Sequence, residues 1–475
     1  MTRETAILIT LIVYKIVLLL IGFYASRKTK DGTDFFLGGR SLGPTVAALS
    51  ASASSSSAWT LLGVSGAAYA TGLAALWLFP ACLGGFAINW FLLGPGLRRL
   101  SKEQDFLTTT EVLAGPRGTP HRVLVGRVAS AMIVLSLATY VATQFQGAGK
   151  TFSEIFGLSS VHSILIGAGI VVLYTMMGGF WAVSLTDSLQ GLLMMLTSLI
   201  LPVAALVSVG GPLEMFRKMA GVEQTTYMHL LGSHGSTLAG VGFVLGLLGI
   251  GLGYPGQPHV VNRFMAIKNE AAMSRGRLIA MTWGTVVYAG MLIVGWCGRI
   301  LFPGLPDKEV VFLTATTELF HPVVAGVMIA AVVSAIMSTA DSQLLVLVSS
   351  LTHDLNLGGK SHQNLLVRSR VVILVVSACS VLAAIYGPKE IFNFVLFAWT
   401  AMGSAFGPLL LVTVLRGRVS SGHTLVAMLL GFSLSVAAYS IPAIKGGVIE
   451  RAVPWVLALV VALAGSTAKS PRETD

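Results

Sequence analysis

The sequence predicts an all-α integral membrane protein, and two observations carry this prediction. Only 11% of the residues are charged and 54% are hydrophobic, and the mean hydropathy is +0.81. Soluble domains carry about 25% charged residues, whereas a chain surrounded by lipid needs no polar surface along its spans. The second observation is that the apolar residues fall into about thirteen stretches, each long enough to cross a bilayer as a helix.

Short connections separate these stretches, so we expect one transmembrane domain over residues 1–475. The 53 glycines are spread through the apolar stretches, where small residues let helices approach closely in lipid. The net charge of +11 lies in short clusters between the spans, which argues against a nucleic-acid partner. The expected spans are 6–25, 43–69, 73–97, 124–149, 160–179, 184–210, 238–258, 277–302, 321–350, 368–387, 391–415, 421–443 and 451–468.

The basic residues also predict the orientation. With the N-terminus outside, roughly 20 basic residues face the cytoplasm and roughly 8 face outward, as the positive-inside rule requires. The C-terminus is then cytoplasmic, and we expect the chain in the inner (cytoplasmic) membrane of the cell. The residues assigned to the inner side are Arg27, Lys28, Lys30, Arg40, Arg98, Arg99, Lys102, Arg117, Arg122, Arg263, Lys268, Arg275, Arg277, Lys360, Arg368, Arg370, Arg416, Arg418, Lys469 and Arg472.

Two charged residues, Lys15 and Asp187, lie inside or at the edge of expected spans. Lys15 interrupts the first span and is either a pathway charge or a snorkelling or protein-facing lysine on a peripheral helix. We favour the second interpretation. Asp187 comes where the sixth span starts, so it either caps that helix or lies near a cation route.

The second and seventh spans carry sequences that interrupt a helix. The second contains SASASSSS (residues 50–57), and serines compete with a helix for backbone hydrogen bonds. The seventh contains GIGLGYPGQP (residues 249–258), where Pro255 lacks a backbone donor and glycines loosen the rest. Either could be an ordinary kink. However, the two spans lie five apart and cross in opposite directions, as expected of a transporter with two inverted five-helix repeats, each opening with a broken helix.

The ninth span carries the third polar feature. Ser338 and Thr339 place two hydroxyl groups side by side, and Asp341 follows within a turn. Hard oxygen ligands suit sodium, and an acidic residue this deep is a functional candidate. The alternatives are helix packing for the hydroxyl groups and, for Asp341, an inner-end position wetted by the cytoplasm.

Motifs along almost the whole chain resemble the sodium:solute symporter family, and within it the bacterial sodium/proline symporters. The matching stretches are FLGGRSLGP (36–44), AINW (87–90), GGF (178–180) with Thr186 and Asp187, GLGY (251–254), GQPH (256–259), RFMA (263–266), MST (337–339), QLL (343–345) and AFGP (405–408).

The resemblance implies a leucine-transporter-type core of two inverted repeats, over residues 43–210 and 238–415. One peripheral helix (6–25) precedes this core and two C-terminal helices (421–468) follow it. The resemblance also implies a sodium site between the second and ninth spans. Its implied ligands are the carbonyl groups of Ala53, Ser56 and Ala335 and the hydroxyl groups of Ser338 and Thr339. The solute would lie near Ser57, Trp59, Tyr140, Tyr254 and Pro258, and a possible additional cation route would involve Ser55, Asp187 and Asp341.

Two positions depart from the proline carriers. They have an aspartate where this chain has Ser55 and a tryptophan where it has Ile250. The first change removes a negative charge beside the cation, which weakens the case for sodium dependence. The second removes an aromatic wall of the solute pocket and loosens the assignment of proline.

The sequence thus predicts a secondary active symporter, not an enzyme. It would couple inward sodium flow to uptake of a small solute, L-proline or a related amino acid, by alternating access. Its partners are the small-molecule substrate, the sodium ion and the lipid bilayer, and we expect it to function as a monomer. The alternatives are proton- or sodium-coupled uptake of another small carboxylate or organic solute and, in another class, a membrane-embedded sensor or enzyme.

Overall fold

The computed structural model describes residues 2–26, 37–176, 180–235, 237–355 and 362–467. Over these ranges the chain is helical, with two isolated β-bridges and no strand. Ten described segments are long and apolar enough to cross a membrane, which confirms the predicted all-α membrane architecture. Several basic residues assigned to the inner side lie outside the described ranges: Arg27, Lys28, Lys30, Lys360, Lys469 and Arg472.

The long segments differ in three places from the expected spans. Helical conformation runs from Trp59 to Glu103, so the second and third expected spans are joined. The expected spans 160–179 and 451–468 form shorter helices, α9 and α21. The main helices are α1 (Arg3–Ser26), α3 (Pro44–Ser55), α4 (Val64–Thr71), α5 (Leu78–Ala87), α6 (Gly94–Glu103), α8 (Arg122–Phe156), α9 (Ser160–Thr175), α10 (Phe180–Val209), α11 (Pro212–Ala220), α12 (Leu238–Gly249), α13 (Pro258–Met265), α14 (Glu270–Leu301), α15 (Val311–Leu319), α16 (Pro322–Ser349), α17 (His362–Tyr386), α18 (Ile391–Leu415), α19 (Ser421–Tyr439), α20 (Val448–Arg451) and α21 (Val453–Ala464).

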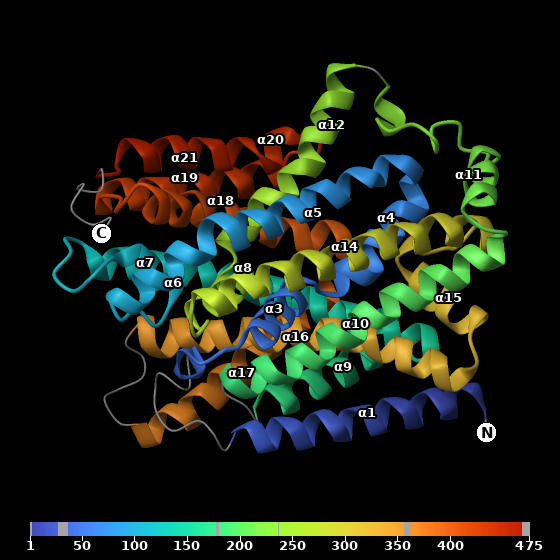
Figure 1. Cartoon of the computed structure of the whole chain (residues 1–475), viewed down its shortest axis with the longest axis horizontal. Coiled ribbons are helices and arrows are strands. Elements are labelled where there is room, and N and C mark those ends of the chain that lie inside the picture. The colour runs from blue at the N-terminus through green and yellow to red at the C-terminus, as the bar shows by residue number, and fades with distance from the viewer. Residues whose placement is uncertain (1, 27–36, 177–179, 236, 356–361, 468–475) are drawn as a thin grey trace.

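The short helix α3 lies in the middle of the bundle, packed against α10, α14 and α16 (Figure 1). At one edge α1 packs on α16 and α10. At the opposite edge α19 and α21 pack on α18. Lys15 of α1 faces the protein, because its Nζ contacts Sδ of Met337 on α16. The structure therefore agrees with a protein-facing lysine on a peripheral helix.

The predicted break in the second span is confirmed. Helix α3 ends at Ser55, and Ser56 has non-helical angles (φ −118°, ψ 86°). The hydroxyl group of Ser55 donates to the carbonyl oxygen of Ser52 at 2.9 Å, the back-bonding by which serines compete with a helix. The helix resumes as the π-helical turn η2 (Trp59–Gly63) and continues into α4.

The predicted break in the seventh span is confirmed as well. After α12 the chain tightens into the 3-10 helix η6 (Ile250–Gly256), which contains Pro255. Gln257 is extended (φ −97°, ψ 101°), and Pro258 occupies the first turn of α13. A proline is tolerated there because its missing N–H would be unsatisfied anyway.

Candidate cation and solute site

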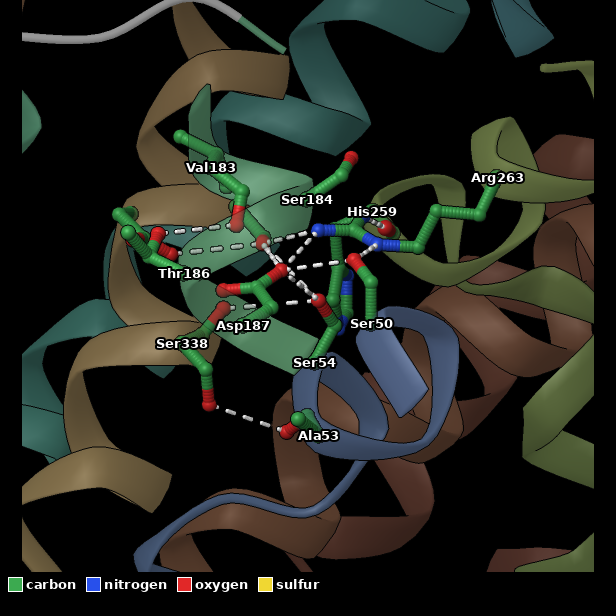
Figure 2. A network of polar contacts seen from close by, with 12 residues as sticks. Ser50, Ala53, Ser54, Val183, Ser184, Thr186, Asp187, His259, Arg263 and Ser338 are labelled. Carbon is green, nitrogen blue, oxygen red and sulfur yellow. Dashed lines mark hydrogen bonds and ion pairs between the residues drawn. The ribbon is translucent and has the colours of Figure 1, made fainter. Parts of the chain in front are cut away.

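Backbone and hydroxyl oxygens converge where α3 ends against α16. The Ser338 hydroxyl donates to the carbonyl oxygens of Ala53 at 3.2 Å and of Ala335 at 3.3 Å. The Thr339 hydroxyl donates to the carbonyl oxygen of Ser54 at 3.1 Å. All these residues are fully buried, and Figure 2 shows Ser338 facing Ala53. Each hydroxyl can rotate to present its lone pairs, so the cluster suits a small hard cation.

The two serines at the end of α3 face different surroundings. Ser56 is the first residue of the break, and its N–H donates to the Ala53 carbonyl oxygen at 3.1 Å, which keeps it beside the oxygen cluster. Ser55 faces away from that cluster and lines a small cavity of about 10 Å³ with Asn89 and Tyr254. A cavity of this size holds at most a water molecule.

The second half of the broken helix begins at Ser57 with its first N–H groups satisfied. The Ser57 hydroxyl oxygen accepts from the N–H of Trp59 at 3.1 Å. The side-chain carbonyl of Gln144 accepts from the N–H of Ala58 at 3.2 Å. A helix start carries partial positive charge and attracts anions. The break therefore has carbonyl oxygens on one side and, on the other, a helix start whose N–H groups are paired with Ser57 and Gln144.

Aromatic side chains close the space beside this helix start. The Tyr140 hydroxyl donates to the Ser57 hydroxyl at 3.3 Å. Tyr140 packs edge-on against Trp399, with ring centroids 6.3 Å apart, and Tyr254 does the same at 4.7 Å. Tyr140 also packs against His259, which follows Pro258 at the start of α13. Of the expected solute residues, Ser57, Tyr140 and Tyr254 are thus linked through one group of contacts, and Pro258 precedes His259, which belongs to the same group.

The fifth expected solute residue, Trp59, belongs to a different part of the site. Its ring stacks on Phe392 with centroids 5.4 Å apart, and Phe392 lines a cavity of about 840 Å³ at the end of the bundle where α12 begins. The buried carboxylate of Glu309 accepts from the N–H groups of Ile391 at 3.0 Å and Phe392 at 2.8 Å, which fixes the start of α18. Trp59, two residues after Ser57, thus contacts the wall of this cavity through Phe392.

Substituting Gly253 by alanine tests the packing of the aromatic wall. A Cβ atom there would lie 2.1 Å from Nε1 of Trp399, which donates to the carbonyl oxygen of Ile250 at 3.0 Å. We expect Gly253→Ala to displace Trp399, at a cost of about 1–3 kcal/mol, and to lower the apparent solute affinity about tenfold. Initial rates of uptake against solute concentration measure this. Gly84→Ala is the matched control, because a Cβ at Gly84 would meet nothing within 4 Å. An equal effect of both substitutions would contradict the prediction.

A second network of polar side chains lies one helical turn from the oxygen cluster (Figure 2). Nη2 of Arg263 lies 2.7 Å from Oδ2 of Asp187, and both side chains are buried. The same carboxylate oxygen accepts from the hydroxyl groups of Ser50 at 2.9 Å and Ser54 at 3.3 Å. Arg263 also donates to the hydroxyl groups of Ser50 at 2.8 Å and Ser342 at 2.5 Å. The network joins α3, which precedes the first break, and α13, which follows the second, to α10 and α16.

Three interpretations of charged residues change with the structure. Arg263 is not a loop residue, because it lies in α13 with 2% of its surface exposed. Asp187 does not cap a helix, since α10 begins two turns earlier at Phe180. Asp341 is not wetted, because it is fully buried. One oxygen of Asp341 accepts from the Ser342 hydroxyl at 3.4 Å, and Oδ2 has no hydrogen-bond partner among the described residues.

Sequence reasoning missed Arg263, Trp399 and Gln144 as site residues. Arg263 lies within two turns of the break in the seventh span and belongs to one of the matching motifs. Its closeness to the break could have marked it as a site residue. Trp399 and Gln144 lie inside the apolar helices α18 and α8. Nothing in their local sequence separates them from core residues, because their role depends on which helices meet.

Comparisons with known proteins agree with this architecture. The model of the sodium:solute symporter family matches residues 35–431. The osmoregulated proline transporter OpuE of Bacillus subtilis is 36% identical over 433 residues, covering 90% of this chain and 87% of that protein. The sodium/proline symporter of Escherichia coli is 36% identical over 450 residues, covering 91% and 87%.

Two solved structures share the fold. A Na⁺-coupled sialic acid symporter in a substrate-bound outward-open state superposes with a TM-score of 0.78 at 20% identity and covers 99% of both chains. A nucleobase–cation symporter in a closed conformation superposes with a TM-score of 0.59 at 13% identity, covering 92% of this chain and 94% of the other. The leucine-transporter-type fold and the resemblance predicted from the motifs are thus confirmed. This multi-pass membrane protein belongs to the sodium:solute symporter family, whose members are transporters rather than enzymes.

Proposed function

We propose that this chain is a sodium-coupled symporter that takes up a small amino acid, with L-proline as the first candidate. The observation that carries the proposal is the group of buried oxygens from Ala53, Ala335, Ser338 and Thr339 at the break of the second span. Relatives named as proline transporters, at 36% identity over about nine-tenths of the chain, support the choice of cargo.

In this proposal sodium binds between α3 and α16, with Ser56 completing the set of ligands. The solute carboxylate then meets the helix start at Ser57 and Ala58, and its apolar part packs against Tyr140 and Tyr254. Because cation and solute use the two sides of one helix break, each raises the affinity for the other by the same factor. The ion gradient and the membrane potential drive inward release.

The orientation and the route of the ion belong to the same proposal. The basic loops argue for a cytoplasmic C-terminus in the inner membrane. In this orientation the cavity that Phe392 lines opens toward the outside. A further cation route would run past Thr339 to the buried carboxylates of Asp341 and Asp187. Ser55 faces the opposite side of α3 and contributes no charge, so it leaves the route with fewer negative groups than the proline carriers have.

Uptake by proteoliposomes tests the cargo and the ion together. We expect labelled L-proline to accumulate when an inward sodium gradient is imposed, and accumulation to collapse when the gradient is dissipated. Potassium replaces sodium in the control. Accumulation driven by a proton gradient and indifferent to sodium would overturn the coupling ion. Uptake of another small carboxylate in a competition panel, without uptake of proline, would overturn the cargo.

A further inference from the structure

The wall of the cavity that Phe392 lines includes a buried arginine, which the proposed transport site does not use. Arg451 ends α20 and has only 4% of its surface exposed. Its Nε has no hydrogen-bond partner, and none of its side-chain nitrogens forms a hydrogen bond or ion pair with the described residues. Arg451 lines the cavity together with Gly446, and a Cβ added to Gly446 would lie 3.6 Å from Nη2 of Arg451. Arg451 is therefore a buried part of the cavity wall, with its Nη2 next to Gly446.

No neighbouring acidic residue of the described chain forms a hydrogen bond or ion pair with this arginine, although the charge of Glu450 acts on it through space. The carboxylate of Glu450 accepts from the backbone N–H of Gly446, and Glu390 pairs with Lys308 at 2.6 Å on the cavity wall. Lys445, also on the wall, lies over the ring of Tyr439. The lining carries the three cations Lys308, Lys445 and Arg451 and the carboxylate of Glu390. With the adjacent Glu450 counted as well, the positive charges exceed the negative ones by one, so the cavity is weakly electropositive.

We propose that Arg451 forms an outer access site that binds the carboxylate of the incoming solute before the Trp59–Phe392 pair opens. A buried guanidinium without a partner is costly, and its planar fork matches a carboxylate with two parallel hydrogen bonds. Apolar residues such as Leu247 and Phe392 line the same cavity and suit the carbon skeleton of a small amino acid. This inference rests on the proposed uptake of an amino acid and adds a first binding step to it.

The test measures occupancy of the cavity without transport. Ala70, on α4, lines the cavity, so Ala70→Cys offers a thiol there in a background whose three native cysteines are replaced by alanine. The purified full chain is placed in phosphatidylcholine nanodiscs, and the rate of maleimide labelling is followed against acetate and L-proline concentration. We expect both carboxylates to slow labelling, and Arg451→Gln to raise the protecting concentration roughly tenfold. Arg451→Lys should fall between the two.

Arg299→Gln is the matched control, because Arg299 packs on Tyr69 and does not line the cavity. Equal protection in the wild-type protein and Arg451→Gln would overturn the proposal. A lipid phosphate is the other source of an anion. If acetate does not affect the labelling rate and phosphatidylglycerol in the discs slows it, the site binds lipid, and the proposal is overturned. Protection by acetate without proline uptake in proteoliposomes would support the carboxylate site and refute only the choice of cargo.

Discussion

Replacing Ser338 and Thr339 together by alanine should raise the sodium concentration needed for half-maximal uptake by roughly a hundredfold or more. The two hydroxyl groups are two of the five proposed ligands, and each contact with a charged partner contributes about 1.5–3 kcal/mol. The carbonyl oxygens of Ala53, Ser56 and Ala335 remain, and these three oxygens are too few to hold a hard cation firmly. Because cation and solute are coupled, the apparent solute affinity at fixed sodium should fall as well.

The measurement is the initial rate of uptake at a series of sodium concentrations. Ser334→Ala is the matched control, since Ser334 lies on the same helix one turn earlier and bonds to Ala330 and Tyr14 instead of the oxygen cluster. The control should keep the wild-type sodium dependence. A double variant with an unchanged sodium requirement would remove this site from the proposed mechanism.

The position of both helix breaks could be predicted because their causes are local. Consecutive serines compete for backbone hydrogen bonds, and Pro255 lacks a donor, wherever these residues occur. The hydroxyl pair at Ser338 and Thr339 was also visible, because adjacent oxygens are uncommon in an apolar helix. These local features, with the apolar spans, were enough for the fold class and for a candidate cation site.

The partners of the buried charges could not be predicted, because they depend on tertiary packing. Arg263 is 76 positions from Asp187 in the chain, and only the packing of both α13 and α10 against α3 brings the two together. Basic residues near span ends usually serve orientation, so Arg263 was grouped with the loops. The partnerless Arg451 raises the same difficulty, since no sequence pattern distinguishes a paired arginine from an unpaired one.

Removing either member of the Arg263–Asp187 pair should nearly abolish uptake. Asp187→Asn leaves a buried guanidinium without its carboxylate, and Arg263→Gln leaves a buried carboxylate without its cation. Breaking a buried pair in this way costs about 3–5 kcal/mol, which lowers the melting temperature of the purified protein as well. The double substitution removes both charges, so it should recover much of the lost thermal stability.

Uptake should not recover in the double variant, because we expect the Arg263–Asp187 pair to hold the carrier closed on the side of the membrane where the pair lies. Arg263 and Asp187, through Ser50, Ser54 and Ser342, tie α3 and α13, one segment of each broken span, to α10 and α16. A neutral substitute restores the charge balance but not these charge-assisted hydrogen bonds, which are about twice as strong as neutral ones. Melting temperatures and uptake rates of the single and double variants therefore separate folding from gating.

The Arg98–Glu270 pair provides the matched comparison. It joins the same end of the bundle at 3.4 Å, but the Glu270 side chain is 74% exposed. Exposed pairs contribute about 0–1 kcal/mol, so Glu270→Gln should change neither the melting temperature nor uptake appreciably. Additive losses of stability in Asp187→Asn and Arg263→Gln, with no recovery in the double variant, would show that the two charges act independently. In that case α3 and α13 would have to be held by their packing alone.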